Sequence, residues 1–191
     1  MLRIACLASA LLAAGTVQSA AEEAPWDLAR LMSEFAQVQT SRAKYSEIRR
    51  VAALRQPIML SGTLYYSRPD RIEKQQILPF RETVHVEREQ LTVEREGKTR
   101  TVALAGAPPL AALIESLRAT LAGDRAELER LYEVRLEGPR ERWSLKLTPR
   151  DTEIANLIRS IRFAGSGPRV SRVEFLEPGG DSSVMTIEHE S

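Results

Sequence analysis

The stretch that decides the fold of this chain is GTLYYSRPDR, residues 62–71. Its apolar run 64–66 favours an extended backbone, because aromatic side chains fit a pleated surface. Pro69 has no backbone N–H to donate and disfavours a helical conformation for Arg68, so the strand ends or turns at this point. The sequence therefore predicts a strand that runs through Gly62 and holds Arg68 at its end.

Short strands surround this stretch along residues 43–104. Each is bounded by Pro, Gly or a cluster of charges, and Val84 and Val86 alternate with polar neighbours. Glu96-Gly97-Lys98 is typical of a hairpin turn. The predicted strands are Tyr45 to Leu54, Ile58 to Arg68, Arg71 to Leu78, Arg81 to Glu87, Gln90 to Arg95 and Thr99 to Leu104.

A second group of strands follows residue 131. Apolar residues again alternate with polar ones, as in Trp143, Leu145 and Leu147. Asp151 to Asn156 is compatible with a loop or with one helical turn. The predicted strands are Tyr132 to Glu137, Glu141 to Leu147, Ile158 to Ala164, Val170 to Glu177 and Ser182 to Glu188.

Helical patterns flank the first group of strands. From Trp26 to Arg42 an apolar residue recurs every three or four positions, which predicts a helix with one apolar stripe. Pro108 opens a second helix that Gly123 ends. Asp124 and the residue three positions later form a capping box for a third. The apolar stripes are Leu28, Leu31, Met32, Phe35 and Val38, then Leu110, Leu113, Ile114, Leu117 and Leu121.

This order of elements predicts an α+β fold. Consecutive short strands joined by short turns form an antiparallel meander. So long a meander curves strongly, which indicates an incomplete, half-open β-barrel covered by the helices.

Residues 1–21 are typical of a cleaved secretory signal peptide. Arg3 supplies the positive start, residues 4–17 are apolar and small, and Ser19-Ala20-Ala21 suits a cleavage site. An uncleaved anchor is the alternative, although the apolar run is short for a membrane span. We expect residues 22–191 to form one exported domain without a further domain after the last strand.

Composition excludes several classes of function. Without residues 1–21 the chain has equal numbers of basic and acidic residues, interspersed along its length, and no Cys. Nucleic-acid binding needs a clustered basic face, which is absent. His85 and His189 lie far apart, outside any metal-ligand spacing, and both are predicted to be solvated. No nucleophile, paired carboxylate or phosphate-binding motif indicates an enzyme, and no cofactor is implied.

The chain resembles the LolA family of periplasmic lipoprotein carriers. The resemblance rests on Gly62-x-Leu64 followed by Arg68-Pro69, on Trp143-x-Leu145-x-Leu147-Thr148-Pro149, on the closing strands and on the Gly180-Asp181 turn. It implies a half-barrel whose hydrophobic cavity, lidded by helices, shields the acyl chains of a lipoprotein on its way to the outer membrane. It also implies that the arginine of the Arg-Pro pair latches the lid, and only Arg68 matches it.

The resemblance also implies the residues that line the cavity or lid: Leu31, Phe35, Leu64, Tyr66, Leu113, Leu117, Trp143, Leu145 and Phe175. From the residues alone, such side chains are more often ordinary core residues, and an arginine such as Arg68 is more often a surface residue at a strand end. Both interpretations stay open at this point.

The expected role is a monomeric periplasmic transport chaperone. Its partners would be an acylated cargo, an inner-membrane transporter and an outer-membrane acceptor. The family's aromatic residues after Arg-Pro and after the Asp-Gly turn are absent here, where the chain reads Arg71-Ile72-Glu73-Lys74 and Glu96-Gly97-Lys98. This departure indicates a divergent branch, for which the alternatives are a carrier of lipid or glycolipid for an inner-membrane exporter and a regulatory lipid- or protein-sensing module.

Overall fold

The computed structural model describes residues 25–190, so the predicted signal peptide lies outside the described residues. Eleven strands form one antiparallel sheet in the order β6-β5-β4-β3-β2-β1-β11-β10-β9-β8-β7. Their bounds are β1 Thr40–Arg50, β2 Ile58–Ser67, β3 Arg71–Leu78, β4 Glu82–Glu87, β5 Gln90–Arg95, β6 Lys98–Ala103, β7 Tyr132–Glu137, β8 Trp143–Pro149, β9 Ser160–Ser166, β10 Arg169–Leu176 and β11 Ser182–His189.

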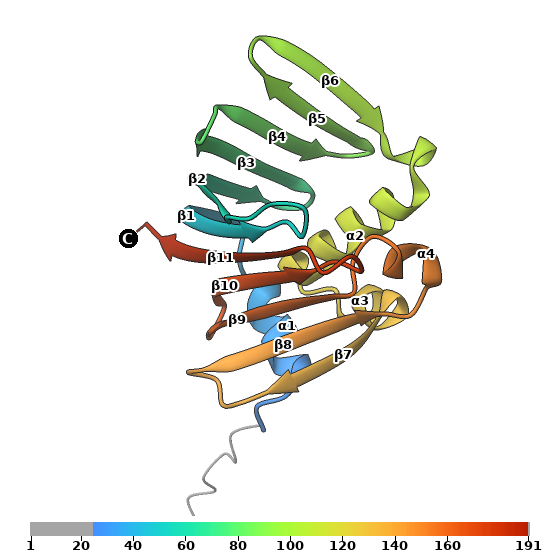
Figure 1. Cartoon of the computed structure of the whole chain (residues 1–191). Coiled ribbons are helices and arrows are strands. Elements are labelled where there is room, and N and C mark those ends of the chain that lie inside the picture. Colours follow the sequence, from blue (N-terminus) through green and yellow to red (C-terminus); the bar gives the residue numbers. More distant parts are fainter. Residues whose placement is uncertain (1–24, 191) are drawn as a thin grey trace, which may run out of the picture.

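Two meanders, β1 to β6 and β7 to β11, are joined where the first strand pairs with the last. The sheet twists and curves but does not close, since β6 and β7 remain separate outer strands among those described (Figure 1). The strand twist accumulates over so many strands that a flat sheet is excluded. The predicted α+β fold with an open, strongly curved antiparallel sheet is confirmed.

The helices gather on one side of the sheet (Figure 1). They are α1 Leu28–Ala36, α2 Pro108–Ala122, α3 Arg125–Leu131 and the short α4 Thr152–Ala155, with a 3-10 turn η1 at Leu104–Gly106. The capping residues predicted from the sequence are confirmed at the ends of these helices. The Asp124 carboxylate accepts from the Glu127 N–H at 3.0 Å, and Gly123 ends α2 in the left-handed region at φ 73. Asp151 caps α4, so the ambiguous segment is a helical turn.

The core lies between the helices and the concave face of β7 to β11. Leu31, Met32 and Phe35 of α1 pack with buried side chains of β8 and β9. Trp143 is buried, donates its indole N–H to the Gly167 carbonyl at 2.8 Å and meets the Phe35 ring edge-on at 5.8 Å. A smaller cluster joins the N-terminal half of α2 to β4 through Val86, Leu104 and Ile114. Helix α2 therefore spans both halves of the sheet.

The predicted helix from Trp26 to Arg42 is wrong in its second half. Helix α1 ends at Ala36, and β1 begins at Thr40. Burial along β1 alternates with a period of two, as expected for a strand. Ala43 pairs with Leu64 of β2, so the backbone of this segment forms hydrogen bonds to a neighbouring strand instead of those within a helix. Val38, which continues the helical stripe in the sequence, lies in the connection between the two elements.

Candidate functional site

Arg68 lies directly after β2 and reaches two helices. Its Nη1 donates to the carbonyl oxygen of Ala36 at 2.7 Å and to that of Ala122 at 3.1 Å. These are the last residues of α1 and α2. One guanidinium therefore ties the C-terminal ends of both helices to the end of one strand.

The chemistry of helix ends explains this contact. The last carbonyls of a helix have no partner within the helix, and the helix dipole makes this end negative. A guanidinium is a permanent cation with several N–H donors in a rigid fork, so it can satisfy more than one carbonyl at once. Such charge-assisted bonds are stronger than neutral ones. The hydrogen bonds of Arg68 to the Ala36 and Ala122 carbonyl oxygens, called the Arg68 fastening below, thus link the sheet to both helices.

The two helix ends also touch each other. A Cβ atom at Gly123 would lie 2.1 Å from the Met32 carbonyl oxygen and 2.8 Å from the Ala36 nitrogen. No side chain fits there, and the left-handed backbone independently favours glycine. Because the helices approach so closely, Arg68 can reach both of them.

An apolar cavity lies beneath this junction. Its volume is about 140 Å³. Phe35 and Val38 line it from the α1 side, Leu121 from α2, and the concave faces of β1, β2, β10 and β11 complete it. Tyr66 also lines it, and its buried hydroxyl has no hydrogen-bond partner among the described residues.

The cavity is small for an acyl chain. An engineered apolar cavity of about 150 Å³ holds one benzene molecule. A long acyl chain has more than twice as many carbons, so the cavity in this arrangement of the helices, called the closed form below, has room for only part of such a chain. Separation of α1 and α2 from the sheet would enlarge this space.

The predicted cavity residues divide into groups. Phe35, Leu64 and Tyr66 line the cavity. Leu31, Trp143 and Leu145 are fully buried in the main core, and Leu113, Leu117 and Phe175 are half-buried against it. Contact of any of these residues with cargo stays a prediction.

A charged cluster around Glu47, which was not predicted from the sequence, lies on the same concave face. Glu47 is 1% exposed and accepts from Lys74 at 2.6 Å, from Arg49 at 3.0 Å and from Ser183 at 2.7 Å. The Lys74 ammonium also lies 4.8 Å from the centre of the Tyr45 ring. A strand predicted from Thr40 would have placed Glu47 on the same face as Ala43 and Tyr45, which was the available signal.

The Glu47 cluster should make stability depend on pH. Burial by itself raises the pKa of the Glu47 carboxyl, but the ion pair and hydrogen bond with Lys74 outweigh burial and hold that pKa below its ordinary value. This contribution to the free energy of unfolding is present above the unfolded pKa of about 4.3 and is lost as the pH falls through the lower folded-state value.

We expect Glu47→Gln to lower the free energy of unfolding by about 2 kcal/mol at neutral pH, because Lys74 loses its charged partner. The difference from the wild type should shrink in acid, below a pH of about 4. Urea unfolding of the variant and of the wild type, at neutral pH and again below a pH of about 4, measures this difference in the free energy of unfolding. Glu188→Gln, at an exposed position of β11, is the control. An equal loss at both pH values would contradict the assignment.

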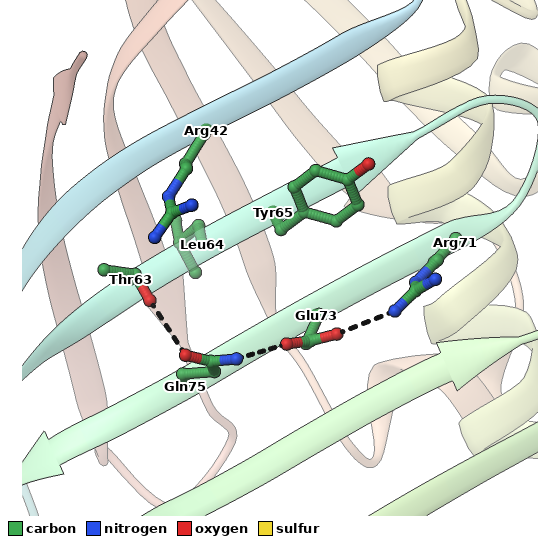
Figure 2. Close-up of a pocket in the computed structure, with 7 residues that line it drawn as sticks. All are labelled: Arg42, Thr63, Leu64, Tyr65, Arg71, Glu73 and Gln75. Atoms are coloured by element: carbon green, nitrogen blue, oxygen red, sulfur yellow. Dashed lines mark hydrogen bonds and ion pairs between the residues drawn. The ribbon is translucent and has the colours of Figure 1, made fainter.

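A second hollow lies on the opposite, convex face of β1 to β3 (Figure 2). It measures about 220 Å³ and is mostly polar, with a chain of hydrogen bonds from Thr63 through Gln75 and Glu73 to Arg71. His85 adds contacts from its two ring nitrogens to Glu73 at 3.5 Å and Glu87 at 3.2 Å.

The prediction that both histidines are solvated is wrong. His85 is half-buried between the Glu73 carboxylate of β3 and the Glu87 carboxylate of its own strand, β4. His189 is half-buried with its Nε2 2.8 Å from the Val170 carbonyl oxygen, at the edge of the cavity. Within residues 25–190 no cluster of His, Cys, Asp and Glu is arranged to hold a metal. The helices of that range are all too short or too polar to cross a membrane.

Comparison with known proteins gives a family match over most of the chain. The family described as outer membrane lipoprotein carrier protein LolA-like matches residues 19–186. A search of curated proteins gave no match.

Several solved structures are similar to this chain. A putative outer membrane lipoprotein-sorting protein domain from Vibrio parahaemolyticus is 9% identical, covers 86% of this chain and 91% of its own, and has a TM-score of 0.45. The MucA/MucB complex of Pseudomonas aeruginosa is 18% identical over 84% of this chain and 53% of that chain, with a TM-score of 0.39. The lipoprotein LppX of Mycobacterium tuberculosis is 9% identical over 83% and 93%, with a TM-score of 0.37.

Proposed function

This chain belongs to the LolA-like family of outer membrane lipoprotein carrier proteins, and we propose that it shields the acyl chains of lipoproteins beneath α1 and α2 and delivers them toward the outer membrane. The observation that carries the proposal is the Arg68 fastening above an apolar cavity. The family is one of carriers, and the proposed role needs no catalytic group.

The physical task of such a carrier is to keep an acyl chain out of water. Burial of each CH₂ group is favourable by about 0.8 kcal/mol, so a chain of about 14 carbons is unfavourable in water by about 10 kcal/mol. The concave face supplies apolar surface to cover it. Release must also remain possible, so the bound form has to be opposed by something that favours the closed, empty form.

The Arg68 bonds to Ala36 and Ala122 supply this opposition in our proposal. They exist in the closed form, and α1 and α2 must move for a whole acyl chain to enter. Cargo entry then breaks these bonds, and their re-formation favours release. Tyr66 has a free hydroxyl beside the cavity that can donate to a carbonyl of the cargo.

We further propose that residues 1–21 are removed on export and that residues 22–191 act in the periplasm as one monomeric domain. The proposed partners are an inner-membrane transporter that loads the cargo and an outer-membrane acceptor that receives it. A carrier of lipid or glycolipid for an inner-membrane exporter is the second candidate. The segments Arg71-Ile72-Glu73-Lys74 and Glu96-Gly97-Lys98 favour it, because they lack the aromatic residues that the lipoprotein carriers often have there.

Native mass spectrometry of the mature protein purified from the periplasm, followed by lipid extraction, tests the function. A bound acylated lipoprotein or its lipidated peptide supports the first proposal. A free lipid or glycolipid supports the second. A protein that is empty and also fails to take up a fluorescent fatty acid contradicts both.

A further inference from the structure

Two neighbouring loops at one end of the sheet expose apolar side chains. Leu54 and Met59 belong to the β1–β2 connection and the start of β2, and Ile77 and Leu78 end β3. Their exposed fractions are 52%, 59%, 54% and 57%. Leu78 pairs with Ser61, two residues after Met59, so the loops lie side by side. Exposed large apolar side chains that gather in one place commonly mark an interaction surface.

A β-bulge contributes to this exposure. The register between β2 and β3 shifts, with Gly62 opposite Gln76 but Ser61 opposite Leu78, so Ile77 is the extra residue. A regular strand would turn one of two consecutive residues toward the concave face. The bulge instead leaves both Ile77 and Leu78 more than half exposed. The local backbone is thus shaped so that the apolar side chains project.

The same loops are basic. Residues 49–59 and 77–81 contain Arg49, Arg50, Arg55 and Arg81 and no Asp or Glu. Arg50, Arg55 and Arg81 are exposed, and in the part of the chain that the structure describes they form no ion pair. The Asp181 carboxylate accepts from the Ala52 N–H at 2.7 Å and so holds the first loop in place.

We propose that loops 50–59 and 77–81 form a tip that docks on membrane surfaces rich in anionic phospholipid. Apolar side chains inserted at the headgroup boundary, with arginines beside anionic headgroups, are the usual composition of an interfacial membrane contact. Four side chains on two loops are far fewer than the ~20 residues per side of a stable protein interface. The tip is independent of the cargo cavity, which lies near the other ends of the same strands.

Sedimentation of the cargo-free mature protein with lipid vesicles tests the tip. We expect binding to protein-free vesicles of phosphatidylcholine mixed with phosphatidylglycerol, weaker binding at high salt, and none to phosphatidylcholine alone. The triple variant Arg50→Gln, Arg55→Gln, Arg81→Gln should lower partitioning about a hundred-fold, since each arginine near an anionic surface contributes about five-fold. Leu54→Ser with Leu78→Ser should also weaken it.

The matched control changes the same charge elsewhere: Arg100→Gln, Arg162→Gln, Arg169→Gln, all at exposed positions outside the loops. This control variant should bind the anionic vesicles at least ten-fold better than the triple variant of the loop arginines. Equal loss in both triples, no binding of the wild type at low salt, or binding only to native membranes that contain protein would each overturn the proposal. None of these results bears on cargo in the cavity, so the tip and the carrier function can fail separately.

Discussion

Arg68→Leu is expected to bind a fluorescent fatty acid about thirty-fold more tightly than the wild type and to release it more slowly to acceptor vesicles. In the proposed cycle the Arg68 bonds to Ala36 and Ala122 stabilise the closed, empty form, and cargo entry would break them. Their removal therefore lowers the free energy that cargo binding must overcome. Two charge-assisted bonds at a partly exposed site contribute about 2 kcal/mol in total, which corresponds to the stated ratio.

Two further variants make this result specific. Arg68→Lys should lie between wild type and Arg68→Leu, because an ammonium lacks the planar fork that reaches both carbonyls. Arg100→Leu removes an exposed arginine of β6, a strand that contributes nothing to the cavity lining, and should leave binding unchanged. Unchanged affinity and unchanged release rate in Arg68→Leu would show that the Arg68 bonds do not control cargo binding.

Gly123→Ala is expected to destabilise the closed form by at least about 3 kcal/mol. A residue other than glycine is strained at this left-handed position, and the added Cβ would lie 2.1 Å from the Met32 carbonyl oxygen. Because backbone atoms on α1 cannot give way as a flexible side chain can, α1 and α2 must separate. Separation of these ends also removes the geometry by which Arg68 reaches both.

Thermal unfolding and binding of a hydrophobic dye measure the effect of Gly123→Ala. We expect a lower melting temperature and stronger dye binding to the folded protein, since the cavity opens. Gly179→Ala is the control, because nothing lies within 4 Å of an added Cβ there. If Gly123→Ala and Gly179→Ala behave alike, the close contact between the helix ends is absent in solution.

Local signals predicted the elements that depend on local chemistry. Pro69 ended β2, Gly123 ended α2, and Asp124 began α3 where expected. At the Glu96-Gly97 turn both residues have positive φ, 53 and 73, as a two-residue hairpin requires. The α+β class and open curved sheet followed from the order of these elements.

What failed depended on distant partners. The apolar stripe of α1 continues through Val38, so the sequence alone did not show that Ala43 would pair with Leu64. The site was predictable only in part, because the partners of Arg68 are distant in the sequence. Arg68 stood out beside Pro69, but its carbonyl partners on α1 and α2 are backbone atoms, which leave no mark in a sequence. Alternation along β1 places Glu47 on the face of Tyr45, but its partners Lys74 and Ser183 come from two other strands that the sequence alone did not bring beside it.

The most direct test of the account is photo-crosslinking with a fatty acid that carries a diazirine near its methyl end. The mature protein is loaded, irradiated and digested, and labelled residues are located by mass spectrometry. If the acyl chain is held between the helices and the sheet, the labels will fall on residues that line the cavity, such as Phe35, Leu64, Leu121 and Ile187. Labels confined to the convex face or to the exposed loops 50–59 and 77–81 would contradict the central claim that the acyl chain is held beneath the helices.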